Sequence, residues 1–352
     1  MAHEQYTENN TSYHAASIKT PDTNNLQPDN SLLHESSQVN TVGSMPSLQP
    51  DELLSHKSEV LHASTLSTTD WNTEWKLMQR VRRRFDDAQY WNKRSKSFGS
   101  KDAPSPYVKA FLEKADIKEG DVVFDMGCGT GSLAVPLARA GHHVIAGDFS
   151  QGMLDQAQER QKAAEVCGID FKLMRWDDNW DALGLTEESV DVAIASRSIS
   201  CYDLGSALDK LHRVARRRCC VTVACGCSPR MDERVLAACG IHNEQGSDAQ
   251  YVWNILFNKG RLATVDYIRS ARKDTFNTDT EAFDDFSRMI DEATANSTQD
   301  ARAAKKQLRT WLDHNLIENE TAGMPDHKGN IEGQLRLRKA RIITWAFIAW
   351  NK

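Results

Sequence analysis

The sequence lacks any long hydrophobic run. No stretch of about 18 apolar residues occurs in the chain, so it predicts no membrane span. The N-terminus also lacks the positive residues and apolar core of a secretory signal, which favours a cytoplasmic location. A long basic stripe is absent too, and the chain has 43 Lys and Arg against 49 Asp and Glu. The densest basic runs, 80–84 and 213–218, are predicted to be solvated helix faces, so nucleic acid is a disfavoured partner.

Residues 1–65 contain few aromatic side chains. They are rich in Asn, Ser, Thr, Gln and His, with four scattered prolines. Such a segment buries too little apolar surface to offset the entropy lost on ordering. We therefore predict a disordered tail over this range, and its composition indicates no role for it.

Paired Cys-x-x-Cys motifs are absent, although the chain has eight cysteines. Cys219, Cys220, Cys225 and Cys227 cluster in and after an expected strand, where cysteine behaves as a small apolar residue. We therefore predict no metal site. Disulfides are disfavoured in a reducing compartment.

The most informative feature that is present is a strand-like run that ends in three alternating glycines. Residues 122–124 are apolar and lead to Asp125 at the carboxyl end of the expected strand. Gly127, Gly129 and Gly131 then allow a tight turn and a close approach of the backbone to a ligand. A strand, a glycine loop and a helix N-terminus together predict a nucleotide-type site at the carboxyl edge of a parallel sheet.

The charge of Asp125 discriminates between nucleotides. The loop does not match the dinucleotide fingerprint, because Ser132 stands where its third Gly or Ala is required, and it does not match the phosphate-loop pattern. Asp125 would repel a pyrophosphate, but it suits a cofactor with a cationic amino-acid end and no phosphate. Residues 125–131, Asp-Met-Gly-Cys-Gly-Thr-Gly, resemble the first motif of class I S-adenosylmethionine (SAM)-dependent methyltransferases.

This resemblance extends over roughly residues 90–270 and implies the contacts of the cofactor. Asp148 ends the second expected strand, about 20 residues beyond the glycines, and is implied as the ribose ligand; the alternative is a carboxylate that only caps a helix. An acidic residue after the third strand is implied to meet the adenine, either Asp177 or Asp178. The implied cofactor-binding residues are Asp125, Gly127, Cys128, Gly129, Gly131, Asp148, Phe149, Met153, Trp176, Asp177 and Ser196.

The end of the fourth expected strand, at residues 196–198, lies beside the transferable methyl group in this family. The chain lacks the Asn/Asp-Pro-Pro-aromatic tetrapeptide of methyltransferases that act on amide or nucleobase nitrogens, which argues against that chemistry. Arg197 can meet a carboxylate or phosphate of the acceptor, or it can have a structural role. The catalytic residues are not identified, and the candidates are Tyr90, Arg197, Tyr202 and Asp203.

The resemblance implies a Rossmann-like α/β fold. It has a seven-stranded, mostly parallel sheet, with the last strand antiparallel and helices on both faces. We expect one lid helix over about 69–87, a helix over 204–218, and two inserted helices over 280–293 and 301–316. The predicted boundaries are a disordered tail (1–65), an N-terminal helical lid (66–115), a SAM-binding core (116–270), a helical insertion or cap (271–330) and a final strand that completes the sheet (331–352).

The function predicted by this resemblance is SAM-dependent methyl transfer to a small-molecule acceptor by direct in-line displacement. Positioning supplies most of the catalysis, because the methyl donor is already activated. One alternative is a protein or RNA methyltransferase that docks its substrate with the basic helices and the tail. The other is a SAM-binding regulator or partner subunit without turnover. The sequence does not indicate the acceptor, the methylated atom, the need for a general base or the oligomeric state.

Overall fold

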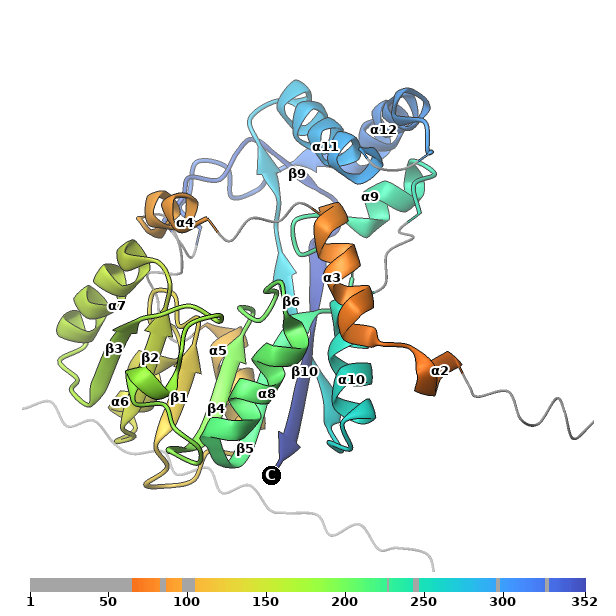
Figure 1. Ribbon diagram of the computed structural model, residues 1–352. Helices are drawn as coiled ribbons and strands as arrows, with labels where there is room; N and C mark the ends of the chain where they lie inside the picture. Colours follow the sequence, from red (N-terminus) through yellow and green to blue (C-terminus); the bar gives the residue numbers. More distant parts are fainter. Residues whose placement is uncertain are drawn as a thin grey trace, which may run out of the picture. The chain divides into compact units, whose positions relative to one another are not determined.

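The computed structural model divides the chain into two units, Met1–His62 and Ala63–Lys352. It describes residues 65–82, 87–96, 105–226, 228–242, 247–295, 298–326 and 329–352, without the side chains of 81 and 82. The predicted tail therefore lies outside the described residues, except for Thr65. The unit Ala63–Lys352 contains helices and strands in alternation (Figure 1).

A seven-stranded sheet is the centre of this unit, with the strand order β3-β2-β1-β4-β5-β10-β6. Strand β1 pairs in parallel with β2 and β4, whereas β10 is antiparallel to both β5 and β6. The predicted Rossmann-like fold with an antiparallel last strand is confirmed. The strands are β1 (Val123–Met126), β2 (Val144–Asp148), β3 (Ile169–Leu173), β4 (Val190–Ser196), β5 (Ala215–Ala224), β6 (Thr264–Arg272) and β10 (Arg341–Asn351).

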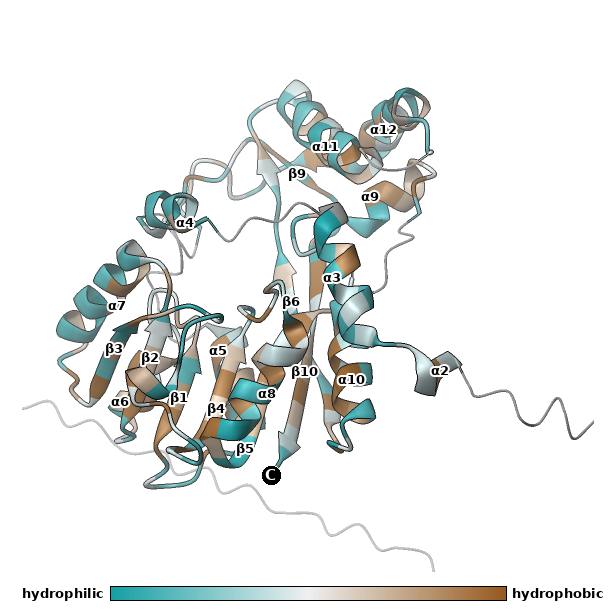
Figure 2. Cartoon of the chain, viewed as in Figure 1, coloured by the Kyte–Doolittle hydropathy of each residue, from teal (hydrophilic) through white to brown (hydrophobic). Residues whose placement is uncertain are grey.

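Helices cover both faces of the sheet, so the central strands are buried on both sides. This explains why β1 and β4 have nearly continuous apolar runs instead of alternating ones. Figure 2 shows hydrophobic colour along β4 and mostly hydrophilic colour on helix α4 (Ala88–Ser95). One face packs against α5 (Pro106–Ala115), α6 (Ala134–Arg139) and α7 (Gln151–Ala163), and the other against α3 (Trp71–Arg82), α8 (Leu204–Val214) and α10 (Asp248–Asn258).

The N-terminal segment forms separate helices: the helix expected over 69–87 begins after Asp70 as predicted, but α3 ends at Arg82 and α4 begins after Asp87. A short helix, α2, spans Thr65–Thr68. The carboxylate of Asp70 then accepts hydrogen bonds from the N–H groups at the start of α3. Asp87 plays the same part for α4 and accepts from the N–H of Gln89. Two capping carboxylates therefore begin two helices here.

The basic run after α8 also differs from its prediction. Helix α8 ends at Val214, and the next residues belong to β5, so the expected helix over 204–218 is too long. Arg216 forms an ion pair with Asp191 at 2.9 Å, and Arg217 pairs with Asp121. These arginines join neighbouring strands at the amino edge of the sheet and do not form a solvated helix face.

Apart from α10 and β6, the elements between β5 and β10 form a second layer, which we call the cap. Its helices are α9 (Glu233–Ala238), α11 (Asp279–Thr294) and α12 (Ala301–Asn315), and in Figure 1 they lie together at the end of β6. The cap also contains a three-stranded sheet in the order β7-β9-β8 that was not predicted. Its strands are β7 (Thr275–Phe276), β8 (Leu316–Glu318) and β9 (Leu335–Leu337), and a 3-10 helix, Asp181–Leu183, precedes β4 in the core.

Candidate functional site

The glycine loop between β1 and α6 has a backbone that only glycine adopts easily. Gly127, Gly129 and Gly131 have φ values of +75°, +55° and +77°, in the left-handed region that side chains with a Cβ disfavour. A Cβ on Gly127 would also lie 2.3 Å from the Cβ of Ser198. The first glycine therefore lets the end of β1 approach the segment that follows β4.

Asp148, the last residue of β2, holds this loop in place. It is 5% exposed. Its Oδ2 accepts a hydrogen bond from the N–H of Gly129, and its Oδ1 accepts one from the N–H of Ser150, both at 2.9 Å. Ser150 in turn caps α7 by accepting from the N–H of Met153. A carboxylate has about four acceptor sites, more than the N–H groups of Gly129, Ser150 and Phe149 occupy, so these contacts do not prevent Asp148 from binding a hydroxyl group.

Asp125 is the most deeply buried carboxylate of the site, with 1% of its surface exposed. No described residue donates a hydrogen bond to it. Burial raises the pKa of Asp125 to about 7, and the neighbouring carboxylate of Asp148 adds to this effect. A buried carboxylate without a donor is unfavourable when ionised. A cationic group would relieve this, so Asp125 fits a cofactor that carries an ammonium group.

The segment after β3 contains the residues that were predicted to meet the adenine. The indole N–H of Trp176 donates to the carbonyl of Ser198 at 3.0 Å. The side chain of Asp177 is 82% exposed and pairs with Arg175. Asp178 instead accepts a hydrogen bond from the N–H of Arg175 at 2.7 Å. Of the two acids, Asp177 is thus the one that remains available to a ligand.

Of the other predicted cofactor residues, Phe149 contacts this segment, whereas Met153 and Cys128 are buried. The guanidinium of Arg175 lies 5.4 Å from the ring centre of Phe149. Met153 is 3% exposed and Cys128 is 7% exposed. Lys210 was not predicted, yet its ammonium donates to the carbonyls of residues 176 and 178 at 2.6 and 2.8 Å. This lysine fixes the loop from a helix more than 30 residues away in the chain.

Arg197, directly after β4, is presented in a specific orientation. It has a φ of +59°. Its guanidinium carbon lies 4.1 Å from the ring centre of Tyr107 and 5.6 Å from that of Trp345. Such contacts stabilise a cation by about 0.5–2 kcal/mol. Arg197 makes no ion pair with a carboxylate in the described parts of the chain, so its charge is available to a ligand.

Tyr107 was not among the predicted site residues. Its hydroxyl lies 2.8 Å from the Ser196 Oγ and 2.6 Å from the Thr222 Oγ1. These two hydroxyl groups stand near the carboxyl ends of β4 and β5. The N–H of Arg197 also donates to the Thr222 Oγ1 at 3.0 Å. Burial raises the pKa of Tyr107, so the phenol stays neutral and orients the aromatic ring beneath the guanidinium.

The other three catalytic candidates lie where the N-terminal helices meet the core. Asp203 caps α8 and pairs with Lys76 at 2.6 Å. The hydroxyl of Tyr202 accepts from Arg80 at 3.1 Å. The hydroxyl of Tyr90 accepts from Arg230 at 3.3 Å, which links α4 to the segment after β5. The contacts of Asp203 are those of a structural residue.

Helices α3 and α4 are anchored near the ends of the strands by buried polar contacts. The indole N–H of Trp75, which is 0% exposed, donates to the carbonyl of Cys201 at 2.8 Å. On α4, the Asn92 Oδ1 accepts from the Ser150 Oγ at 2.7 Å and from the N–H of Gly152 at 2.9 Å. A Cβ on Gly152 would lie 3.1 Å from the Cα of Asn92. Helix α4 therefore packs directly on the start of α7, next to Asp148.

The cysteine cluster gives no sign of metal chemistry within the described ranges. No group of three or more His, Cys, Asp or Glu side chains there could hold a metal ion. Burial raises the pKa of Cys220 to about 12, and Cys219 is equally buried. Cys227 lies outside the described residues.

No helix among the described residues is long and apolar enough to cross a membrane.

Comparisons with known proteins identify a methyltransferase domain in the chain. A family model described as "Methyltransferase domain" matches residues 123–218, from the start of β1 into β5. An uncharacterized protein of Haemophilus influenzae is 30% identical over 251 residues, which is 70% of this chain and 82% of that protein. The match to the Haemophilus influenzae protein is therefore much longer than the segment that the family model covers.

Two enzymes match a shorter part of the chain. The malonyl-[acyl-carrier protein] O-methyltransferase of Yersinia pestis is 36% identical over 98 residues, which is 28% of this chain and 33% of that enzyme. The demethylmenaquinone methyltransferase of Corynebacterium glutamicum is 32% identical over 116 residues, which is 33% of this chain and 46% of that enzyme. The chain thus covers less than half the length of either enzyme.

Proposed function

The chain belongs to the class I SAM-dependent methyltransferases, and we propose that it methylates a small-molecule acceptor that carries an anionic group. Its cofactor, SAM, supplies an activated methyl group on a sulfonium. The proposed reaction is a direct in-line displacement, in which holding the acceptor atom in line accounts for most of the rate enhancement. A general base is needed only if the acceptor atom must lose a proton.

In this proposal, the acidic side chains bind the cofactor. Asp125 pairs with the ammonium group, because its buried carboxylate has no donor within the described part of the protein. Asp148 accepts hydrogen bonds from the ribose hydroxyls with its remaining lone pairs. Asp177 meets the adenine, next to Trp176. Phe149, Met153, Cys128, Ser196 and the three glycines of the loop complete the proposed contact surface.

The observation that carries the proposal for an anionic acceptor is the orientation of Arg197. A guanidinium held over the rings of Tyr107 and Trp345 is pre-organised for a planar or tetrahedral anion. It follows β4, whose carboxyl end adjoins the glycine loop through the contact of Ser198 with the carbonyl of Met126 at 2.6 Å. A carboxylate or phosphate at Arg197 would therefore hold an acceptor close to the cofactor.

Two further observations favour a small molecule over RNA or protein. Helices α3 and α4 are anchored on the segments around Cys201 and Ser150, so they border the carboxyl edge of the sheet. Arg216 and Arg217, which could have formed a docking surface, are engaged in ion pairs at the opposite edge.

The test is to follow an isotopically labelled methyl group from SAM into a fractionated cell extract. We expect label in the low-mass fraction, on a compound that an anion exchanger retains before methylation. The Gly129→Val variant serves as the control without cofactor binding. Label found in RNA or protein would contradict the proposal, and SAM binding without label in any fraction would favour the regulator without turnover.

A further inference from the structure

The cap contains a cavity lined mainly by charged side chains. It has a volume of about 180 Å³ and lies between α11, the end of β6 and the start of β10. Four guanidinium groups line it, those of Arg230, Arg272, Arg288 and Arg341. Arginine binds carboxylate and phosphate groups through two parallel hydrogen bonds, so the composition of this lining points to an anion.

Arg341 is the buried member of this group, with 6% of its surface exposed. Its Nε is fully buried and makes no hydrogen bond. Its ion-pair partner is Asp274, whose Oδ2 lies 3.5 Å from the Nε, beyond good hydrogen-bond geometry. A guanidinium remains charged when buried, and an incompletely paired buried charge is unfavourable. Because Arg341 lines the cavity, an anion there would give this guanidinium a second partner.

The acids around the cavity do not neutralise the arginines. Asp274 also binds Arg272, at 2.8 Å, so one carboxylate serves two guanidinium groups. Asp285 pairs with Arg288 at 2.7 Å. With Glu292 as the third acid, the lining has four positive and three negative groups. The net charge of the cavity is therefore positive.

The geometry of β10 relates this cavity to Arg197. Arg341 and Trp345 are four residues apart in the same strand, and side chains at that spacing point to the same face. At about 3.3 Å per residue, they are separated by about 13 Å along the strand. Trp345 is one of the two rings beside Arg197. Two cationic positions thus follow one face of β10 beyond the carboxyl edge of the parallel strands.

We propose that the cap cavity binds a phosphate or carboxylate group at the far end of the acceptor. This inference rests on the proposed function, in which a first anionic group of the acceptor meets Arg197. The acceptor is then an elongated molecule with an anionic group toward each end. Arg230 connects the cavity to α4 through the hydroxyl of Tyr90, so an anion bound by Arg230 would lie next to the contact that holds α4.

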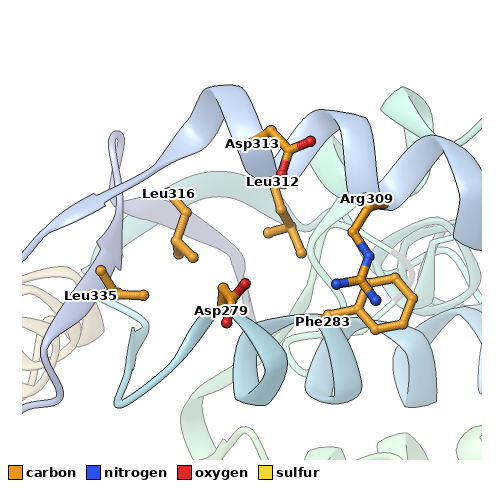
Figure 3. Close-up of a pocket in the computed structure, with 7 residues that line it drawn as sticks. All are labelled: Asp279, Phe283, Arg309, Leu312, Asp313, Leu316 and Leu335. Carbon is orange, nitrogen blue, oxygen red and sulfur yellow. The ribbon is translucent and has the colours of Figure 1, made fainter.

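A second hollow of the cap supplies a matched control. It has a volume of about 240 Å³ and lies between α11, α12, β8 and β9. Figure 3 shows its one guanidinium, that of Arg309, lying against the ring of Phe283, and the distance to the ring centre is 3.8 Å. Arg309 is exposed and is not part of the proposed subsite. Replacing it changes the charge of the cap by the same amount as replacing Arg341.

The experiment is a calorimetric titration of the full-length protein with inorganic phosphate at constant ionic strength, repeated with acetate. We expect saturable phosphate binding that Arg341→Met weakens at least about tenfold, the effect of losing a charge-assisted hydrogen bond. Arg309→Met should bind phosphate like the unmodified protein. Stronger binding of acetate than of phosphate would assign the far group of the acceptor as a carboxylate, and the reverse as a phosphate.

Arg341 is buried, so a second variant guards against misfolding. Arg230→Met changes an exposed side chain of the same lining and should weaken phosphate binding several-fold. Absence of saturable binding of either anion would overturn the inference, and so would equal binding by the Arg341 and Arg309 variants. Either result would leave methyl transfer and SAM binding unaffected, so the inference fails separately from the proposed function.

Discussion

The two halves of the carboxyl edge of the sheet place different charges at the proposed ligand contacts. On the side of β2 and β1 the buried ionisable side chains are acids, Asp125 and Asp148. Toward β10, the proposed anion contacts are two guanidiniums, those of Arg197 after β4 and of Arg341 in β10, although acids such as Asp274 also lie there. The first half suits a cofactor with a cationic end, and the second suits an anionic acceptor. If the proposed contacts hold, charge alone distinguishes the positions of the two ligands.

The two halves also respond differently to pH. A buried carboxylate can take up a proton, and the pKa of Asp125 has risen to about 7. A guanidinium cannot lose its proton in a protein. The cofactor half therefore changes its charge near neutral pH, whereas the acceptor half keeps its charge. The following predictions test this contrast, from the largest expected effect to the smallest.

The largest effect is expected for Gly129→Val, which should abolish cofactor binding by the cofactor half of the edge. Valine disfavours the φ of +55° at this position. It would also displace the N–H that donates to Asp148. We expect SAM affinity to fall by more than about a hundredfold, because several cofactor contacts would be lost together. Calorimetry gives the affinity, and circular dichroism checks the fold. Saturation by SAM at the concentration needed for the unmodified protein would refute the assignment of the loop.

Asp125→Asn should give the next largest effect and make SAM binding independent of pH. The amide cannot pair with a cation, so affinity should fall about ten- to a hundredfold above neutral pH. In the unmodified protein, affinity should rise as the pH increases through about 7, because the ionised form of Asp125 binds the ammonium group. Calorimetry in buffers of different ionisation enthalpy should detect protons released on binding. The same pH profile in both proteins would contradict the pairing.

Asp125→Asn should also change the stability of the protein. Above neutral pH, where it weakens SAM binding, it should raise stability. The folded protein binds the Asp125 proton more tightly than the unfolded chain, because the folded pKa is about 7 and the ordinary value is 3.8. The contribution of Asp125 to stability is therefore present at low pH and is lost as the pH rises toward 7. Without SAM, Asp125→Asn should melt at a higher temperature than the unmodified protein above neutral pH, and this difference should shrink in acid.

Arg197→Met tests the acceptor half in the same way. We expect the KM for the acceptor to rise about tenfold, the effect of losing one charge-assisted contact. The affinity for SAM should stay within about twofold, because Arg197 is not among the proposed cofactor contacts. Steady-state kinetics and SAM titration measure the two quantities. A parallel loss of both would mean that Arg197 supports the fold of the β4 end and does not bind the acceptor.

The cofactor half could be predicted from the sequence, because its signals are local. The strand, the three glycines and Asp148 lie within 26 residues, from 123 to 148, and parallel-strand topology brings them to one edge. The acceptor half depends on partners far apart in the chain. Tyr107 meets Ser196 across 89 residues and Thr222 across 115. No periodicity or motif joins such positions, so Tyr107 was missed.

The corrections to the fold have similar physical reasons. Asp70 and Asp87 are both good capping residues, but the apolar spacing between them does not show that two helices begin. Arg216 and Arg217 extend β5 because acids on neighbouring segments pair with them, which a helical pattern cannot indicate. The small sheet of the cap has strands of two or three residues, too short for an alternating pattern to be read.

The smallest effect concerns the choice between two neighbouring acids in the cofactor half. Asp178 accepts a hydrogen bond from the backbone of Arg175, so Asp178→Ala should lower the free energy of unfolding by about 1 kcal/mol and change SAM affinity little. Asp177 is exposed, so Asp177→Ala should leave stability unchanged and weaken SAM binding about two- to tenfold, the range of a single hydrogen bond. Thermal melts and calorimetry separate the two effects. If the outcomes are exchanged, Asp178 meets the adenine, and the loop held by Lys210 must rearrange when the cofactor binds. If both variants bind SAM normally, neither acidic side chain binds the adenine, and recognition of SAM depends on Asp125 and Asp148.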